Sequence, residues 1–210
     1  MKREFLALHL GNWGKEIDMD LIIIVEDKEE EIRNAQMAVK SHFGIPSEEE
    51  GAYFGIDFLK EKLGNPDWRV FKSGDALVSI MTARNLSEVK RGLDKIYIQG
   101  FCKVFQQVGV ITDLMFPKKK GGKEDPNGLC VLTDCIQKGL PVVVCSDTDH
   151  HDVGYLKDVF PVLGKAHPKG EIPVILDKKD WGRAVSELFR ISVEESPDDR
   201  KNSPSGIEID

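Results

Sequence analysis

Polar side chains with chemical uses follow four apolar runs of this chain. The runs end at Val25, Ile111, Cys145 and Leu176, and the side chains that follow them are Glu26 and Asp27, Asp113, Ser146 and Lys178. Runs of this kind suit buried parallel strands, and open α/β sheets place their chemistry at the carboxyl ends of such strands. One such acid alone is more often the cap of the next turn, but four strand ends together indicate a site.

Three of these side chains are carboxylates that one edge of a sheet can bring together. In the expected sheet the first and third strands are neighbours, and neighbouring parallel strands lie about 4.8 Å apart. The ends of these two strands then place Glu26, Asp27 and Asp113 in one pocket. Carboxylates in one pocket repel one another unless a cation joins them. Mg2+ is the expected cation, because it takes oxygen ligands and accepts phosphate oxygens readily.

The other two side chains suit a phosphoryl group. Ser146 supplies a hydroxyl donor and Lys178 a positive charge at the same edge of the sheet. With a cation, they could hold a phosphoryl group that has been transferred covalently to the Asp113 carboxylate. The alternative for Ser146 is a helix cap. The alternative for Lys178 is a solvated turn lysine, since Asp177 and Lys179 leave the register of the loop open.

The size and charge of the chain limit the classes of protein to which it can belong. Its 210 residues, 40% of them hydrophobic, suffice for one large domain or for one domain with an insertion. The formal net charge of −7 argues against a nucleic-acid-binding surface over the whole molecule. The four cysteines show no metal-ligand spacing, and neither a signal peptide nor a membrane-spanning run is present, so a cytoplasmic protein with free thiols is expected.

Strand and helix patterns alternate along most of the chain. Strands are expected at 20–25, 76–81, around 110–111, 140–145 and 172–176, and helices at 28–43, 86–106, 128–138, 153–160 and 180–191. Asn85 is the expected N-cap of the second helix. The alternation predicts an α/β fold with a five-stranded parallel doubly wound sheet, of strand order 2-1-3-4-5, in three α/β/α layers.

Four further segments lie at the ends of the expected domain, which spans residues 20–192, or within it. Residues 1–19 are expected to form an N-terminal arm and residues 193–210 a disordered tail. Residues 45–74 are expected to be a helical or irregular insertion. The loop 117–126 is polar and rich in glycine, so it is expected to be mobile and exposed. Its three consecutive lysines, 118–120, are either simply solvated or attract an acidic partner or the phosphodonor.

These strand ends resemble the receiver domain of two-component response regulators. The matching motifs are Leu-Ile-Ile-Ile-Val-Glu-Asp ending at Asp27, Val-Ile-Thr-Asp-Leu-Met-Phe-Pro around Asp113, Asn-Gly-Leu at 127–129, Leu-Pro-Val-Val-Val-Cys-Ser ending at Ser146, and Ile-Leu-Asp-Lys ending at Lys178. They cover most of residues 20–191 apart from the insertion. The chain departs from the family where Lys179 follows the lysine in place of the usual proline. It also lacks the aromatic residue that the family often has on the fifth strand.

The resemblance implies a role for each residue. Asp113 would be the phosphoacceptor, and Ser146 and Lys178 would contact the phosphoryl group. The ligands of Mg2+ would be Glu26, Asp27, Asp113 and the backbone carbonyl of Met115. The partners would be a sensor histidine kinase or phosphotransfer protein and a downstream protein, with no direct contact to nucleic acid and no membrane insertion.

Three functions remain open from the sequence. The first is a stand-alone receiver that is phosphorylated on Asp113 and signals through protein contacts. The second is a degenerate receiver that serves as a constitutive protein-binding module. The third is a phosphatase with Asp113 as its nucleophile. Such enzymes need a second acid two residues later as a general acid, and Met115 occupies that position here.

Overall fold

The structure is a computed structural model that describes residues 19–46, 67–73, 76–98, 105–147, 156–167, 170, 172–176 and 178–193. The expected arm before Met19, residues 47–66 of the expected insertion, and the expected tail beyond Val193 lie outside the described residues. Met19 itself begins the first strand instead of ending the arm. None of the helices in the described ranges has both the length and the apolar character that crossing a membrane requires.

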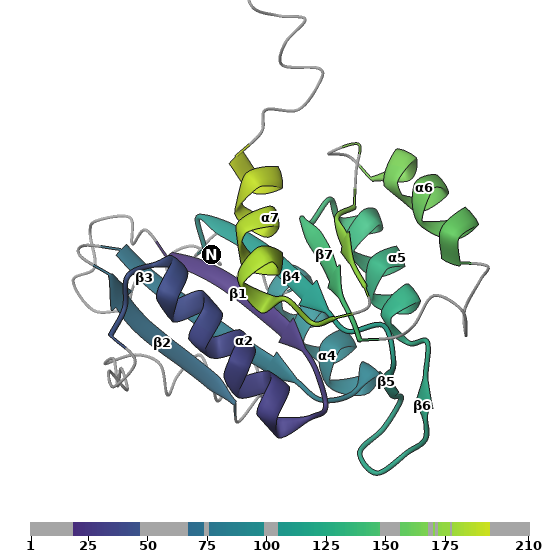
Figure 1. Cartoon of the computed structure of the whole chain (residues 1–210), viewed down its shortest axis with the longest axis horizontal. Helices are drawn as coiled ribbons and strands as arrows, with labels where there is room; N and C mark the ends of the chain where they lie inside the picture. The colour runs from purple at the N-terminus through teal and green to yellow at the C-terminus, as the bar shows by residue number, and fades with distance from the viewer. Residues whose placement is uncertain are drawn as a thin grey trace, which may run out of the picture.

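A six-stranded sheet forms the centre of the fold (Figure 1). Its strands are β1 (Met19–Val25), β2 (Trp68–Ser73), β3 (Ala76–Ala83), β4 (Gln107–Thr112), β7 (Val142–Cys145) and β8 (Val174–Ile175), in the order β2-β3-β1-β4-β7-β8. The strands from β3 to β8 are all parallel, whereas β2 is antiparallel to β3. β1 and β4 lie at the centre and are covered on both faces, which explains their almost continuous apolar runs.

The predicted count of five strands and the order 2-1-3-4-5 are wrong for this sheet, because β2 adds an antiparallel edge. The prediction of a helical or irregular insertion is likewise wrong for residues 68–73. Ser73 pairs with Ala76, so only two residues connect β2 to β3, as in a tight hairpin. Exposed Arg69 and Lys72 interrupt the buried residues of β2 and conceal its strand character in the sequence. Without β2, the five parallel strands follow the order β3-β1-β4-β7-β8.

In the described ranges, five helices cover the two faces of the sheet, as expected of a three-layer α/β/α fold (Figure 1). One face carries α2 (Glu29–His42) and α7 (Trp181–Val193), which pack against each other, and the other carries α4 (Leu86–Ile98), α5 (Gly128–Lys138) and α6 (Leu156–Ala166). Alternate residues of β1 point to the two faces, so Ile22 and Ile24 join one hydrophobic core while Ile23 and Val25 join the other. The parallel strands are therefore held from both sides.

The bounds of most helices agree with the sequence patterns. The helix at 128–138 has the predicted bounds, and Asn85 caps α4 as predicted. Asn85 Oδ1 accepts a hydrogen bond from the Glu88 backbone N–H (3.1 Å), and Asn85 Nδ2 donates one to Glu88 Oε1 (2.7 Å). The predicted end of this helix near 106 is wrong, because α4 ends at Ile98. α6 runs from Leu156 to Ala166 and so lies later in the chain than predicted.

The segment after β4 forms a small hairpin of β5 (Phe116–Pro117) and β6 (Glu124–Asp125) (Figure 1). Of the loop 117–126 that was predicted to be exposed, residues 118–125 are exposed, whereas Pro117 is buried and Pro126 is half-buried. The base of the hairpin is anchored by two hydrogen bonds. Asn127 Nδ2 donates to the Phe116 carbonyl (2.6 Å), and Ser87 Oγ of α4 donates to the Lys118 carbonyl (3.0 Å). The run of lysines thus lies on a hairpin that is fixed next to the end of β4.

Candidate functional site

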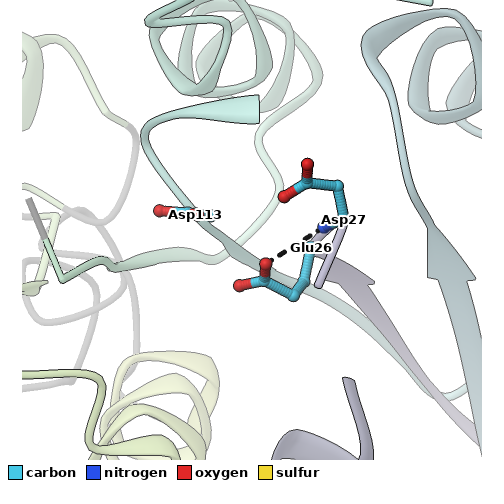
Figure 2. A group of neighbouring side chains, drawn as sticks. All are labelled: Glu26, Asp27 and Asp113. Carbon is cyan, nitrogen blue, oxygen red and sulfur yellow. Dashed lines mark hydrogen bonds between the residues drawn. The ribbon is translucent and has the colours of Figure 1, made fainter. Parts of the chain in front are cut away.

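The register of β1 and β4 brings three carboxylates together. Val25 pairs with Thr112, and the Asp113 backbone N–H donates to the Val25 carbonyl (2.9 Å), so the residues that follow the two strands lie side by side. Ligand oxygens of Glu26, Asp27 and Asp113 all lie within 4.8 Å of one another, around one space (Figure 2). Glu26 and Asp113 are buried and Asp27 is half-buried. The clustering predicted from the sequence is therefore present.

Local backbone groups fix the Glu26 carboxylate. Its Oε1 accepts hydrogen bonds from the backbone N–H groups of Asp27 (3.1 Å) and Lys28 (3.0 Å), immediately before α2 begins. The other oxygen, Oε2, faces the remaining site residues. Asp27 differs, because its Oδ1 is buried without any hydrogen-bond partner. A buried carboxylate oxygen without a partner is unfavourable unless a ligand completes it.

The lysine of the site is Lys179. Its Nζ lies 2.5 Å from Glu26 Oε2 and 2.9 Å from Asp113 Oδ2, and only 3% of its side chain is exposed. Lys178, which the sequence favoured, is exposed to solvent. Lys179 therefore lies beside the carboxylates, one residue later than the lysine that the sequence favoured, and which lysine contacts a phosphoryl group stays a prediction. The sequence could not separate the two adjacent lysines, because the strand before them covers only Val174–Ile175 and not the predicted 172–176.

The Asp113 carboxylate is held by a ring of donors. Oδ1 accepts hydrogen bonds from the Leu114 backbone N–H (2.6 Å) and from Ser146 Oγ (2.6 Å), with the Met115 N–H at 3.4 Å. Ser146 lies at the end of β7, where the sequence placed it, and it is fully buried. Met115 contacts Asp113 through its N–H group, and a metal-binding role for its carbonyl stays a prediction.

Gly128, the first residue of α5, packs directly against the backbone of Asp113 and Leu114. Its backbone N–H donates to the Leu114 carbonyl (3.0 Å). A Cβ atom at this position would lie 2.5 Å from the Asp113 carbonyl oxygen and 2.8 Å from Leu114 Cα. No real side chain fits at such distances, so the missing side chain of Gly128 lets α5 support the loop that carries Asp113.

The three carboxylates of the site carry more negative charge than Lys179 can neutralise. Burial, and then the nearby Asp113 carboxylate, raise the pKa of Glu26 from 4.5 to about 7. Burial acts to lower the pKa of Lys179, but the Asp113 and Glu26 carboxylates outweigh it and raise that pKa above its usual value. One ammonium group cannot neutralise three carboxylates. A divalent cation with oxygen ligands fits this donor set and would also complete the partnerless oxygen of Asp27.

Two exposed residues lie beside the buried group. Asp147, which follows Ser146, has Oδ2 3.4 Å from Lys28 Nζ and Oδ1 3.9 Å from Lys179 Nζ. About half of each side chain of the Lys28–Asp147 pair is exposed, so the pair itself contributes little stability. The pair does, however, connect the loop after β1, which carries Lys28, to the loop after β7, which carries Asp147. Nothing in the spacing of the sequence indicated this pair.

Comparison of the chain with models of protein families, with curated proteins and with solved structures gives no match. The resemblance to receiver domains therefore rests on the residues and the geometry described above.

Proposed function

We propose that this protein is a receiver-like phosphoacceptor, in which Asp113 takes a phosphoryl group in the presence of Mg2+. The observation that carries the proposal is the contact of Lys179 Nζ with both Asp113 Oδ2 and Glu26 Oε2. A buried lysine between two carboxylates, with Ser146 hydrogen-bonded to one of them, supplies the donors that a phosphoryl group on Asp113 needs. The parallel order β3-β1-β4-β7-β8 agrees with the order 2-1-3-4-5 of receiver domains, to which β2 would be an added edge.

The transfer is a displacement at phosphorus. An oxygen of the Asp113 carboxylate forms a bond to the phosphorus atom of the donor. The bond from phosphorus to the donor's nitrogen or oxygen breaks, and its electron pair stays on that leaving atom. Lys179 then pairs with a phosphoryl oxygen, and the Ser146 hydroxyl donates to another. Hydrolysis by water returns Asp113 to its free carboxylate.

Glu26, Asp27 and Asp113 would hold Mg2+, with the Met115 carbonyl as the further ligand that the resemblance implies. When bound, Mg2+ would neutralise the excess negative charge of the carboxylates and of the incoming phosphoryl group. The chain's own contribution is to fix the ligands in place. Backbone N–H groups orient Glu26, and the Leu114 N–H and Ser146 hydroxyl orient Asp113.

The donor would be a sensor histidine kinase or a phosphotransfer protein, and the output a contact with a downstream protein. The site is closed in this structure, since Asp113 is 1% exposed and Ser146 is fully buried. A phosphoryl group, which adds about −1.5 to −2 charge, therefore requires the surrounding loops to rearrange. Such a rearrangement gives the surface two states that a protein partner can distinguish.

The test is incubation with acetyl phosphate and Mg2+, followed by intact mass measurement. The wild-type protein should gain the mass of one phosphoryl group, and neither Asp113→Asn nor a sample with excess chelator should gain it. Beryllofluoride, a non-covalent phosphoryl mimic, should bind the wild type and not the variant. Equal behaviour of wild type and Asp113→Asn in both assays would overturn the proposal and favour a constitutive protein-binding module.

A further inference from the structure

The loop that carries Lys179 follows a very short strand. β8 is only two residues long and ends at Ile175, four residues before the lysine. A long, flexible side chain on such a loop has many conformations, and holding its Nζ between two carboxylates costs conformational entropy. The structure must therefore fix the loop by other contacts. Those contacts lie on the other side of Lys179, where α7 begins at Trp181.

Trp181 is fixed both by packing and by a hydrogen bond. The residue is 4% exposed and belongs to the hydrophobic core shared by α2 and α7. Its indole Nε1–H donates to Glu31 Oε2 at 2.6 Å, which is short for a bond to a carboxylate. Glu31 lies in the first turn of α2, directly after the loop of Glu26 and Asp27. The bond thus joins the start of the helix after the lysine to the start of the helix after the acids.

Asp180 adds a second constraint between the lysine and the tryptophan. Its Oδ1 accepts a hydrogen bond from the Arg183 backbone N–H (2.9 Å), and its carbonyl accepts one from the Ala184 N–H (2.9 Å). These are the contacts of an N-cap, and they set the direction in which the chain enters α7. Lys179 therefore directly precedes the N-cap of an anchored helix. Receiver domains usually have a proline at the position after the lysine.

We propose that Trp181 and Glu31 are positioning residues for Lys179, and that their hydrogen bond determines how well the site holds a phosphoryl group. The inference rests on the proposed function of Asp113 and Lys179. In the described part of the chain neither residue has a hydrogen bond or ion pair with Asp113, so each would act through the lysine loop. The bond aligns two loops that meet at the site but are separated by 150 residues in the chain.

The substitutions that test this proposal remove the bond and keep the packing. Trp181→Phe retains an aromatic ring in the core and loses the N–H donor. Glu31→Ala removes the acceptor, whereas Glu31→Gln keeps an oxygen that can accept the indole N–H. Glu30 is the matched control, since it is an exposed acid in the same helical turn with no hydrogen bond to the indole. Glu30→Ala changes the same charge without touching Trp181.

Beryllofluoride affinity in the presence of saturating Mg2+ is the first measurement. Trp181→Phe and Glu31→Ala should each weaken it by about three- to tenfold, on the scale of one ordinary hydrogen bond, because the lost bond acts on the phosphoryl group only through Lys179. Glu31→Gln and Glu30→Ala should stay within about twofold of wild type. The Mg2+ affinity should not fall in any variant, because the carboxylates and not Lys179 are its ligands. A purely structural role would instead lower stability and both affinities together.

The second measurement follows the lysine itself and needs no phosphoryl chemistry. A buried ammonium group held by two carboxylates exchanges its protons slowly, so its 15N-detected NMR signal should be visible in the wild type and absent in Lys179→Gln. The signal should be lost or broadened in Trp181→Phe and Glu31→Ala and retained in Glu31→Gln.

The two measurements separate the failure of this inference from the failure of the proposed function. If the wild type binds no beryllofluoride, the proposed function fails, and the NMR signals alone decide whether the bond positions Lys179. If the wild type binds the mimic but Trp181→Phe and Glu31→Ala bind it equally well, the positioning role is refuted while the phosphoacceptor stands. An effect of Glu30→Ala as large as that of Glu31→Ala would also refute it, because a change of surface charge would then explain both.

Discussion

The Nζ atom of Lys179 lies 2.9 Å from Oδ2 of Asp113, although 66 residues separate the two in the chain. The same atom lies 2.5 Å from Oε2 of Glu26, so one buried cation joins the ends of β1 and β4. The lysine acts as the internal counter-ion of the acidic group. A bound phosphoryl group would redirect it from the carboxylates to the phosphoryl oxygens.

Replacing this lysine should separate phosphoryl binding from metal binding. Lys179→Gln should weaken beryllofluoride binding by about tenfold or more, because a charge-assisted contact is lost. It should leave Mg2+ affinity equal or tighter, since the carboxylates lose a competing cation. Breaking such a buried pair typically costs about 3–5 kcal/mol, so the variant should be less stable without Mg2+ and regain stability with it.

Lys178→Gln is the matched control for that experiment, because its side chain is exposed on the adjacent position of the same loop. It should behave as wild type in calorimetric titrations with Mg2+ and with beryllofluoride. If Lys178→Gln loses phosphoryl binding and Lys179→Gln does not, the lysine assignment is reversed.

The two lysines also show how far the sequence can predict the site. Glu26, Asp113 and Ser146 follow strands whose apolar runs are long enough to locate their ends, so their meeting could be predicted from parallel geometry alone. β8 has only two residues, although the apolar run predicted a strand over 172–176, so the run did not locate where the strand stops. A shift of one residue then exchanges a buried lysine for an exposed one.

The fold was predictable to a similar extent. Alternating apolar runs and helical periods predicted the parallel strands and the helices on both faces, because each pattern reflects burial. β2 could not be recognised, since it is an edge strand whose exposed Arg69 and Lys72 resemble the polar residues of a loop. The hydrogen bond between Trp181 and Glu31 could not be predicted from the sequence either, because it joins two helices that are distant in the sequence.

Asp27 should be required for Mg2+ binding. Asp27→Asn removes a charged ligand whose Oδ1 is buried and has no partner, so we expect Mg2+ affinity to fall by about tenfold or more. Isothermal titration calorimetry measures the effect, with Glu30→Gln as a control for the loss of one acid from the same region. Unchanged affinity in Asp27→Asn would place the metal elsewhere.

Stability without Mg2+ should depend on pH through Glu26. The pKa of this carboxyl is raised from 4.5 to about 7, so the folded protein binds its proton more tightly than the unfolded chain does. The stabilisation is fully present below pH 4.5 and is lost as the pH rises towards 7, by up to about 3 kcal/mol.

Urea unfolding between pH 4.5 and 8, with chelator present, measures this contribution. Glu26→Gln carries no titrating group at this position, so the difference in unfolding free energy between wild type and variant should shrink or reverse as the pH rises. A difference that does not change with pH would show that Glu26 titrates normally.

Gly128→Ala should displace the backbone of the loop that carries Asp113. The new Cβ would lie 2.5 Å from the Asp113 carbonyl oxygen, so the loop must shift, at a cost of about 1–3 kcal/mol in stability. Beryllofluoride affinity should fall with it. Gly182→Ala is the control, since the nearest atom to its Cβ is 3.6 Å away and the substitution favours the helix. Thermal unfolding should place the two variants on opposite sides of wild type, and only Gly128→Ala should bind beryllofluoride more weakly. A Gly128→Ala protein that matches wild type would remove the packing argument.

Asp147 should oppose phosphoryl binding. Its Oδ1 lies 3.9 Å from Lys179 Nζ and its Oδ2 lies 3.4 Å from Lys28 Nζ, so it holds negative charge beside the place where the phosphoryl group would arrive. Asp147→Asn removes that charge and frees Lys28 to attract an anion. Beryllofluoride should then bind about two- to fivefold more tightly at low salt, on the scale of one partly exposed charge.

The salt dependence distinguishes this electrostatic effect from a change of shape. The carboxylate is half exposed, so salt should screen it, and the affinities of wild type and Asp147→Asn should converge as the ionic strength rises. Asp94→Asn, an exposed acid in the second half of α4, should show no effect at any salt concentration. Weaker binding by Asp147→Asn would mean that Asp147 supports the site by positioning Lys28 or Lys179, and the repulsion predicted here would be wrong.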